Sequence, residues 1–289
     1  MDEFTSKTAK NQQNASVIPT LRLNNGVLIP QLGLGVFLAG RGAKTEQAVL
    51  WALEAGYRHI DTAAVYGNEA EVGRALKASG LPRQELFITG KIWNDHIRAG
   101  LTREAFYQTL ENLQTNYLDL CLLHWPVAGT RQAWAVLEEL YAEGLVRAIG
   151  VSNFQQHHLE DLQTYARIAP MFNQLESHPL FNNQSLIDWC QNQNISVGAW
   201  SPLGGPRVPI LQHPALQALA EKYQRSPAQI VLRWDIQRNL VIIPKSSHQE
   251  RIINNRQIFD FTLSEEDMEV MQSLNLNYRV GPDPDNFNF

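Results

Sequence analysis

Short apolar runs alternate with longer stretches of helical periodicity from residue 31 to about residue 254. Eight runs are rich in β-forming residues, and they span residues 31–36, 57–60, 86–89, 118–123, 146–151, 171–175, 195–200 and 240–243. Most of them are apolar without strict alternation, which is typical of parallel strands covered on both faces. The stretches between them space their apolar residues as amphipathic helices do.

Cap residues support these boundaries. Gly56, Gly80 and Gly144 end helical stretches, because glycine readily adopts the left-handed conformation that closes a helix. Ser226-Pro-Ala-Gln229 combines an N-cap serine, a first-turn proline and a glutamine three residues after the cap, which is typical of a helix start. The alternation predicts an α/β fold, a (β/α)8 TIM barrel. A doubly wound parallel sheet would show a similar alternation and stays the alternative.

The start of the chain differs from this pattern. Residues 1–19 are polar and unpatterned, so we expect a tail with little required structure. Asn25-Gly26 then lies between two short apolar runs, which indicates a β-hairpin before the barrel. No linker or change of composition divides the chain after the tail, so residues 20–289 are predicted to form one barrel domain.

Composition narrows the possible function classes. The chain is 44% hydrophobic and 18% charged, with a formal net charge of −5 and no run of Lys or Arg, so nucleic-acid and anionic-membrane partners are not expected. Cys121 lies in an apolar run and is expected to be a buried reduced thiol rather than a disulfide partner or nucleophile. No stretch approaches the length of a membrane span, and no signal peptide is evident, so we expect a cytoplasmic protein.

Four reactive side chains come after successive predicted strands. Asp61 follows the second run, with Tyr66 five residues later; Lys91 follows the third run and His124 the fourth. Active sites of such barrels lie where strands end and loops begin, so these groups are expected to meet. Each alone is more often a cap, a core group or a solvated charge. Together they suit a general acid for a carbonyl oxygen: a lysine favours the phenolate and lowers the tyrosine pKa, and an aspartate holds the lysine.

Other motifs do not fit. Gly33-Leu-Gly35 resembles the start of a dinucleotide-binding glycine motif, but Leu38 occupies the third position. His157 and His158 are adjacent on a helical stretch, so we expect them to point in different directions, as a solvent-facing pair, and expect no metal site. Lys245, Ser246 and Arg251 surround the start of a helix after the last strand, which favours an anion site; a solvated basic helix start is the alternative.

Taken together, these segments resemble the aldo-keto reductase family. The resemblance lies in GYRHIDTAAVYGNE at residues 56–69, TGKIW at 89–93, LLHWP at 122–126, IGVSNF at 149–154, NQLE at 173–176, AWSPLG at 199–204 and IPKS at 243–246, followed by Arg251 and Asn255. It covers about residues 20–289, and the combination of motifs is highly specific. It implies an NADPH-dependent carbonyl reductase on a (β/α)8 barrel.

The resemblance also implies roles for individual residues. Tyr66 would donate the proton, Lys91 and Asp61 would tune it, and His124 would orient the substrate. The cofactor residues would be Ser152, Asn153 and Gln174 at the carboxamide, Trp200 on the nicotinamide ring, Ser201, Leu203 and Gly204 along the pyrophosphate, Lys245, Ser246 and Arg251 at the 2′-phosphate, and Asn255 at the adenine. The carbonyl pocket would be walled by Phe37, Trp93 and Trp125.

Three positions depart from the family pattern. Gly90 stands where the family usually has Ser or Thr, Trp200 replaces the commoner Tyr, and Asn254 stands where many members have Glu. The loop 125–131 and the tail from Leu274 are short, which resembles the compact microbial members such as the 2,5-diketo-D-gluconate reductases. We therefore expect a monomeric enzyme for small activated carbonyls: dicarbonyls, keto esters and keto sugar acids. A non-catalytic NADP(H)-binding or structural barrel protein is the alternative.

Overall fold

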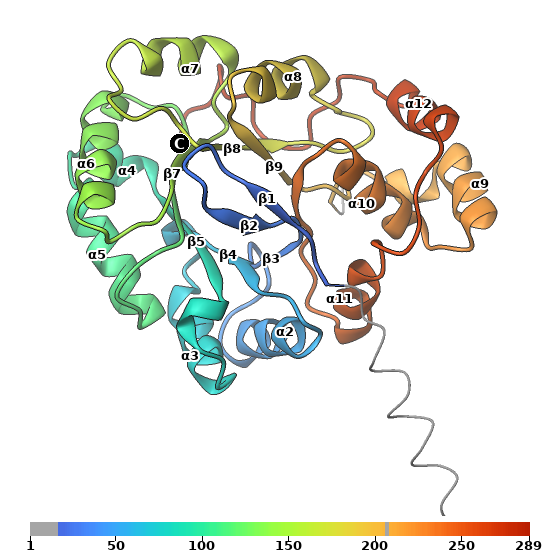
Figure 1. The fold of residues 1–289 in the computed structure, drawn as a ribbon, viewed down its shortest axis with the longest axis horizontal. Coiled ribbons are helices and arrows are strands. Elements are labelled where there is room, and N and C mark those ends of the chain that lie inside the picture. Colours follow the sequence, from blue (N-terminus) through green and yellow to red (C-terminus); the bar gives the residue numbers. More distant parts are fainter. Residues whose placement is uncertain (1–16, 206–207) are drawn as a thin grey trace, which may run out of the picture.

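The computed structural model describes residues 17–205 and 208–289, and its centre is a closed barrel of parallel strands (Figure 1). The strands are β3 (Gly33–Gly35), β4 (His59–Asp61), β5 (Phe87–Ile92), β6 (Leu120–Leu123), β7 (Ile149–Ser152), β8 (Phe172–Glu176), β9 (Ser196–Trp200) and β10 (Val241–Ile243). They pair in chain order, and single bridges from Leu32 to Ile242 and from Gly35 to Lys245 join β3 to β10. The predicted (β/α)8 barrel is confirmed, and the doubly wound sheet is excluded.

Helices surround the strands on all sides in Figure 1. They are α2 (Ala43–Glu54), α3 (Glu69–Ala78), α4 (Asn94–Arg98), α5 (Thr102–Leu113), α6 (Thr130–Ala142), α7 (Gln156–Gln163), α8 (Gln184–Asn192), α9 (Pro214–Tyr223), α10 (Pro227–Gln237), α11 (Gln249–Arg256) and α12 (Glu265–Ser273), with short 3-10 turns η1 (Ala64–Tyr66), η2 (Arg83–Glu85) and η3 (Ile210–Gln212). Ser226 caps α10 in the predicted capping box with Gln229. Gly56, Gly80 and Gly144 all have positive φ after their helices.

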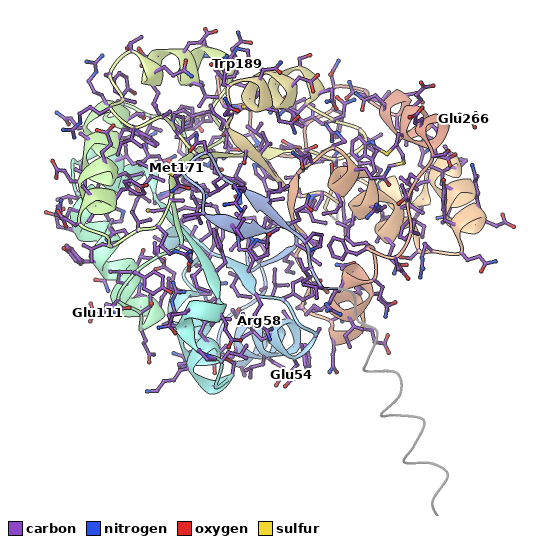
Figure 2. All side chains as sticks on the ribbon, in the orientation of Figure 1. Glu54, Arg58, Glu111, Met171, Trp189 and Glu266 are labelled. Carbon is purple, nitrogen blue, oxygen red and sulfur yellow. The ribbon has the colours of Figure 1, made fainter. Side chains whose placement is uncertain are left out.

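The strands bury their side chains on both faces, as their apolar composition predicts. Every residue of β5, β6, β7 and β8 is buried. Figure 2 shows Glu111 and Glu266 at the outer edge of the molecule, whereas Met171, just before β8, lies inside the ring of helices. Cys121 and Cys190 are buried and unpaired, so the prediction of a buried thiol at Cys121 is confirmed.

The predicted hairpin forms from β1 (Thr20–Arg22) and β2 (Leu28–Pro30) and lies across the barrel in Figure 1. The side-chain amides of Asn24 and Asn25 donate to backbone carbonyls at Pro170, Asn194 and Arg147, each just before a strand. The hairpin therefore covers the amino ends of the strands and leaves the carboxyl ends for the site. Residues 1–16 of the predicted tail lie outside the described residues, and Ile18 is buried in the core.

In the described residues, none of the helices has both the length and the apolar character that crossing a membrane requires.

A buried histidine generates a prediction for stability against pH. His59 is 1% exposed, its Nε2 lies 3.0 Å from Thr89 Oγ1, and burial lowers its pKa to about 4 against the attraction of Asp61. The unfolded chain, with a histidine pKa near 6.5, binds the proton first, so stability is present above pH 6.5 and is lost as pH falls toward 4. We expect His59 to contribute a loss of about 2 kcal/mol between pH 7 and pH 5.

Urea unfolding of the wild type and of His59→Gln at both pH values checks this. The glutamine keeps a polar side chain toward Thr89 but does not titrate. The stability difference between the two proteins should therefore shrink by about 2 kcal/mol at pH 5. A difference that stays constant would show that His59 does not take up the proton.

Candidate functional site

The four reactive residues meet at the carboxyl end of the barrel, as predicted. Asp61 ends β4, Tyr66 ends η1, Lys91 lies within β5, and His124 directly follows β6. Lys91 Nζ donates to Asp61 Oδ1 at 2.5 Å and to the Tyr66 hydroxyl at 3.4 Å. The Tyr66 and His124 rings lie edge to face, 5.8 Å apart. Neighbouring parallel strands bring these side chains together although up to 63 residues of sequence separate them.

The Lys91–Asp61 ion pair is almost completely buried, with side-chain exposures of 0% and 4%. Burial opposes the charge on Lys91, but attraction to Asp61 and Tyr66 outweighs it and raises the lysine pKa above its ordinary value. Lys91 also donates to the carbonyl of Thr62 at 3.0 Å, and Gln174 Nε2 donates to the second oxygen of Asp61 at 2.8 Å. The ammonium group is therefore charged, held from three sides and directed at Tyr66.

Tyr66 differs from expectation in one respect. The sequence predicts that the lysine lowers the tyrosine pKa, and Lys91 does act in that direction. Burial raises the pKa of Tyr66 more strongly, so the net shift is upward, and this part of the prediction is wrong. The physical reason is desolvation: the apolar neighbours of the ring disfavour a phenolate more than one ammonium at 3.4 Å favours it. Tyr66 therefore carries its proton throughout the neutral pH range.

His124 is a neutral imidazole. It is 7% exposed, and burial, together with repulsion from Lys91, lowers its pKa well below the ordinary value. Its Nδ1 has no hydrogen-bond partner in the described part of the chain. A neutral ring offers one N–H to a ligand but is not an acid near pH 7, so of these two residues Tyr66 is the better proton donor.

The predicted carboxamide residues lie beside the reactive group and bond to one another. Ser152 Oγ donates to the carbonyl of Gln174 at 3.0 Å, and Asn153 Nδ2 donates to the carbonyl of His124 at 3.0 Å. Trp200 Nε1 donates to Asn153 Oδ1 at 2.8 Å, which fixes the plane of the indole at the end of β9. The tyrosine that is commoner at this position has no indole N–H, so it would not make this hydrogen bond in the same way.

The predicted phosphate residues gather after β10. Lys245 and Arg251 are exposed, and within the described residues neither has an acidic partner. Partial desolvation and repulsion from Arg251 both lower the pKa of Lys245, which indicates that the two positive charges lie near each other. Ser246 Oγ accepts the backbone N–H of His248 at 3.1 Å. Two cations without a carboxylate favour the anion site over a merely solvated helix start.

The remaining predicted cofactor residues lie on the same side of the barrel. Ser201 has a positive φ of 49°, and the N–H of Gly204 donates to its carbonyl at 2.9 Å, which forms a turn directly after β9. Leu203 is half-buried in that turn, and Asn255 is buried in α11. The backbone carbonyl of Asn254 accepts Gln229 Nε2 at 3.0 Å.

Gly90 faces away from this group. A Cβ there would lie 2.9 Å from Leu118 and 3.3 Å from Thr109, on the outer side of the strand. Its departure from the family pattern is therefore a matter of packing against α5.

Aromatic rings form the wall of the site. Phe37 packs on Tyr66 with centroids 5.0 Å apart, and Trp93 lies edge to face with His124 at 5.2 Å. Two residues that sequence reasoning missed complete this wall. Phe289 stacks on Trp93 at 5.7 Å, and Phe287 lies 5.0 Å from Trp125. The sequence signal that could have identified these two phenylalanines was their alternation with asparagine at the end of a polar segment.

A third missed residue is Glu176, the last residue of β8. Its Oε1 accepts the backbone N–H groups of Val280 and Gly281 at 2.6 and 3.3 Å, and it contacts His178 Nε2 at 3.1 Å. A Cβ on Gly281 would lie 2.3 Å from Cη2 of Trp200, so only glycine permits this approach. Residues 279–289, which we name the closing segment, thus cross Trp200 and reach the aromatic wall.

His157 and His158 do not point in different directions, so this expectation is wrong. Their ring centroids lie 4.0 Å apart, and both approach Asp285. The two residues lie in the first turn of α7, where both side chains reach toward the same carboxylate of the closing segment.

Comparison with known proteins agrees with this geometry. The Aldo/keto reductase family model matches residues 31–276. The chain is 51% identical over 272 residues to the uncharacterized oxidoreductase YtbE of Bacillus subtilis, covering 92% of this chain and 96% of that protein. It is 49% identical over 275 residues to a glyoxal reductase of the same organism, covering 95% and 99%. The crystal structure of a Bombyx mori aldo-keto reductase in complex with NADP has a TM-score of 0.88 and 37% identity, covering 94% and 97%.

A parallel barrel with this group of residues at its carboxyl end defines a carbonyl oxidoreductase. The chain belongs to the aldo/keto reductase family. The predicted likeness to compact microbial members is confirmed. Aldo-keto reductases use NADPH, so the cofactor prediction is confirmed for this chain as well.

Proposed function

We propose that this protein reduces small activated carbonyl compounds, with Tyr66 as the proton donor. The observation that carries the proposal is the buried contact of Lys91 with both Asp61 and Tyr66, facing a neutral His124 inside an aromatic wall. Dicarbonyls, keto esters and keto sugar acids are the substrate classes that we expect.

Each residue of the site has its own part in the chemistry. NADPH supplies the hydride when it is bound. The Tyr66 hydroxyl gives its proton to the carbonyl oxygen, and the ammonium of Lys91 stabilises the phenolate that remains. Asp61 keeps that ammonium in place. The N–H of neutral His124 binds the carbonyl oxygen and directs it at Tyr66. The aromatic wall excludes water, which strengthens each of these electrostatic interactions.

The cofactor residues fit a phosphorylated dinucleotide. The unpaired Lys245 and Arg251, with Ser246, would hold the 2′-phosphate, and Asn255 would lie at the adenine. The pyrophosphate would run along Ser201, Leu203 and Gly204. Trp200 would stack on the nicotinamide, whose carboxamide would meet Ser152, Asn153 and Gln174. The supporting observation is that two adjacent cations lack a carboxylate in the described chain.

Several broader predictions remain part of the proposal. We propose that residues 20–289 act as one domain, that the protein works as a monomer in the cytoplasm, and that it binds no nucleic acid. The alternative of a non-catalytic barrel is not favoured by a buried Lys91–Asp61 pair, because an ion pair without a function is often replaced by apolar residues without loss of stability.

The first prediction of this proposal concerns the proton donor. Tyr66→Phe removes one hydroxyl and keeps the ring that packs on Phe37, so the fold should not change. We expect kcat to fall by about 10²–10⁴, the contribution of general acid catalysis. Steady-state rates with methylglyoxal and NADPH measure this, and NADPH affinity serves as the control. A rate within a few-fold of wild type would remove Tyr66 from the proposed role.

The second prediction concerns cofactor selectivity. Arg251→Ala should weaken NADPH binding by about 1.5–3 kcal/mol, the range for hydrogen bonds to charged groups, and should change NADH binding little. Glu250→Ala, on the preceding exposed residue of α11, is the matched control and should not weaken either cofactor. Quenching of tryptophan fluorescence measures both affinities. Equal losses for NADPH and NADH would place Arg251 away from the 2′-phosphate.

The third prediction concerns substrate size. Phe287 and Phe289 pack directly on Trp125 and Trp93, so the outer wall leaves little apolar surface for a rigid four-ring substrate. We expect kcat/KM for methylglyoxal or 2,5-diketo-gluconate to exceed that for ketosteroids at least about tenfold, or roughly 1.4 kcal/mol in the transition state. A steady-state comparison with saturating NADPH at neutral pH tests this. A ketosteroid that matches the small carbonyls would contradict it.

A further inference from the structure

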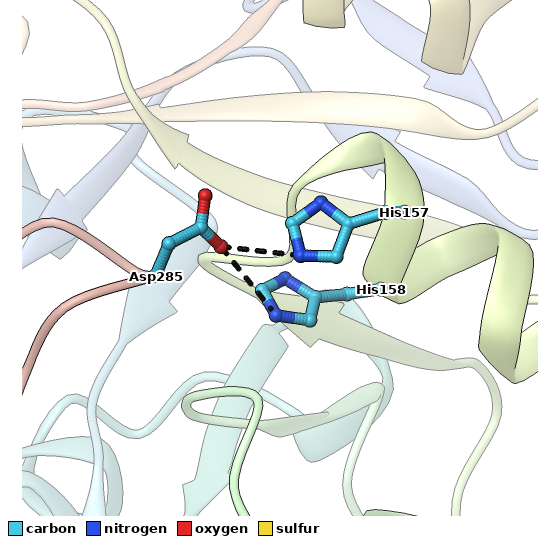
Figure 3. Close-up of side chains that lie close together, drawn as sticks. All are labelled: His157, His158 and Asp285. Atoms are coloured by element: carbon cyan, nitrogen blue, oxygen red, sulfur yellow. Dashed lines mark ion pairs between the residues drawn. The ribbon is translucent and has the colours of Figure 1, made fainter.

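Two histidines and a carboxylate converge on the surface, apart from the reactive group. His157 and His158 belong to the first turn of α7, and Asp285 belongs to the closing segment (Figure 3). Asp285 Oδ1 lies 3.2 Å from His157 Nε2 and 3.6 Å from His158 Nε2. All three ligand atoms lie within 4.8 Å of one another. His157 and Asp285 are exposed, so a solvent ion has direct access.

These distances match the spacing of ligands around one small metal ion. A tetrahedral Zn²⁺ binds imidazole nitrogen and carboxylate oxygen at about 2.0–2.2 Å, which sets neighbouring ligand atoms about 3.3–3.6 Å apart. Both nitrogen-to-oxygen distances fall close to this range without any movement of the backbone. Two imidazoles with one carboxylate are a donor set that suits zinc and similar transition metals better than magnesium or calcium.

We propose that His157, His158 and Asp285 form a binding site for Zn²⁺ or a transition metal of similar preference, with water as the remaining ligand. The site links α7 to the closing segment. Coordination requires both imidazoles to be neutral and the carboxylate to be ionised.

One local hydrogen bond opposes binding and limits its strength. His158 Nδ1 accepts the backbone N–H of Gln155 at 3.1 Å. Coordination through Nε2 moves the ring proton to Nδ1, so the Gln155 N–H must turn to water instead. Gln155 is half-buried, so the exchange costs about one hydrogen bond and weakens metal binding. We therefore expect an exchangeable ion rather than a permanent structural one.

The position of Asp285 connects the proposed metal site to the aromatic wall. Two residues later, Phe287 packs on Trp125, and four residues later, Phe289 packs on Trp93 and Trp125. A metal ion that ties Asp285 to α7 would restrict this part of the closing segment. The inference of a metal site does not depend on the proposed function, because it rests on ligand geometry alone.

The experiment is a titration of the full chain, without a histidine tag, with ZnCl₂ by calorimetry at pH 7.5, and with MgCl₂ for comparison. We expect one Zn²⁺ per chain with a dissociation constant below about 100 µM, and no Mg²⁺ binding. His157→Ala and Asp285→Asn should each weaken Zn²⁺ binding more than about tenfold, since the loss of outer partners alone weakens metal sites 10–100-fold. Both residues are exposed, so these variants should fold, and circular dichroism checks this.

The matched control is His213→Gln, which changes a half-exposed histidine outside the cluster and should leave Zn²⁺ affinity unchanged. Both cysteines are buried and do not compete for the ion. Hydrogen exchange gives an independent measurement: saturating Zn²⁺ should slow exchange at residues 283–289 in the wild type but not in Asp285→Asn. Absence of Zn²⁺ binding, or binding that survives both cluster variants, would overturn the proposal whatever the reductase activity.

Discussion

The buried ion pair between Lys91 and Asp61 is the interaction on which the site depends. Each charge has lost nearly all of its water, so neither can be removed alone without leaving an uncompensated charge in the barrel, at a cost of about 3–5 kcal/mol. The hydrogen bonds of the pair also reach across the barrel mouth, to Tyr66 on one side and to Gln174 of β8 on the other. One contact therefore sets the positions of the reactive phenol and of the neighbouring polar residues.

Charge is distributed unevenly along the site. At the reactive end, Tyr66 and His124 are neutral and Lys91 is paired, so little net charge faces a bound carbonyl. At the other end, Lys245 and Arg251 face solvent without an acidic partner in the described residues, on a chain whose formal net charge is −5. This contrast suits a ligand with an anionic end and an uncharged reacting end, and the electrostatics alone would orient it.

The sequence predicted the parts of this structure that depend on regular elements. All eight strands lie within two or three residues of the predicted runs, and the barrel topology then brings Asp61, Lys91 and His124 to one end. The closing segment has no periodicity, so its path over Trp200 and its aromatic contacts could not be predicted. The convergence of His157 and His158 depends on Asp285 and therefore on the same path. The pKa of Tyr66 was misjudged because charged neighbours can be identified in a sequence, whereas the degree of burial cannot.

The wall of the site and its reactive groups come from different kinds of structure. Asp61, Lys91 and His124 are on or directly after barrel strands, whose register their neighbours fix on both sides. Phe37, Trp125 and the closing segment instead lie outside the strands. The rings of Phe37 and of Phe289, the last residue of the closing segment, are exposed. Changes of length or composition in those segments therefore leave the strand register intact. The barrel strands therefore fix the reactive residues, whereas the aromatic wall around the substrate belongs to segments that can be replaced. New substrate shapes are accessible to an engineer by altering those segments alone.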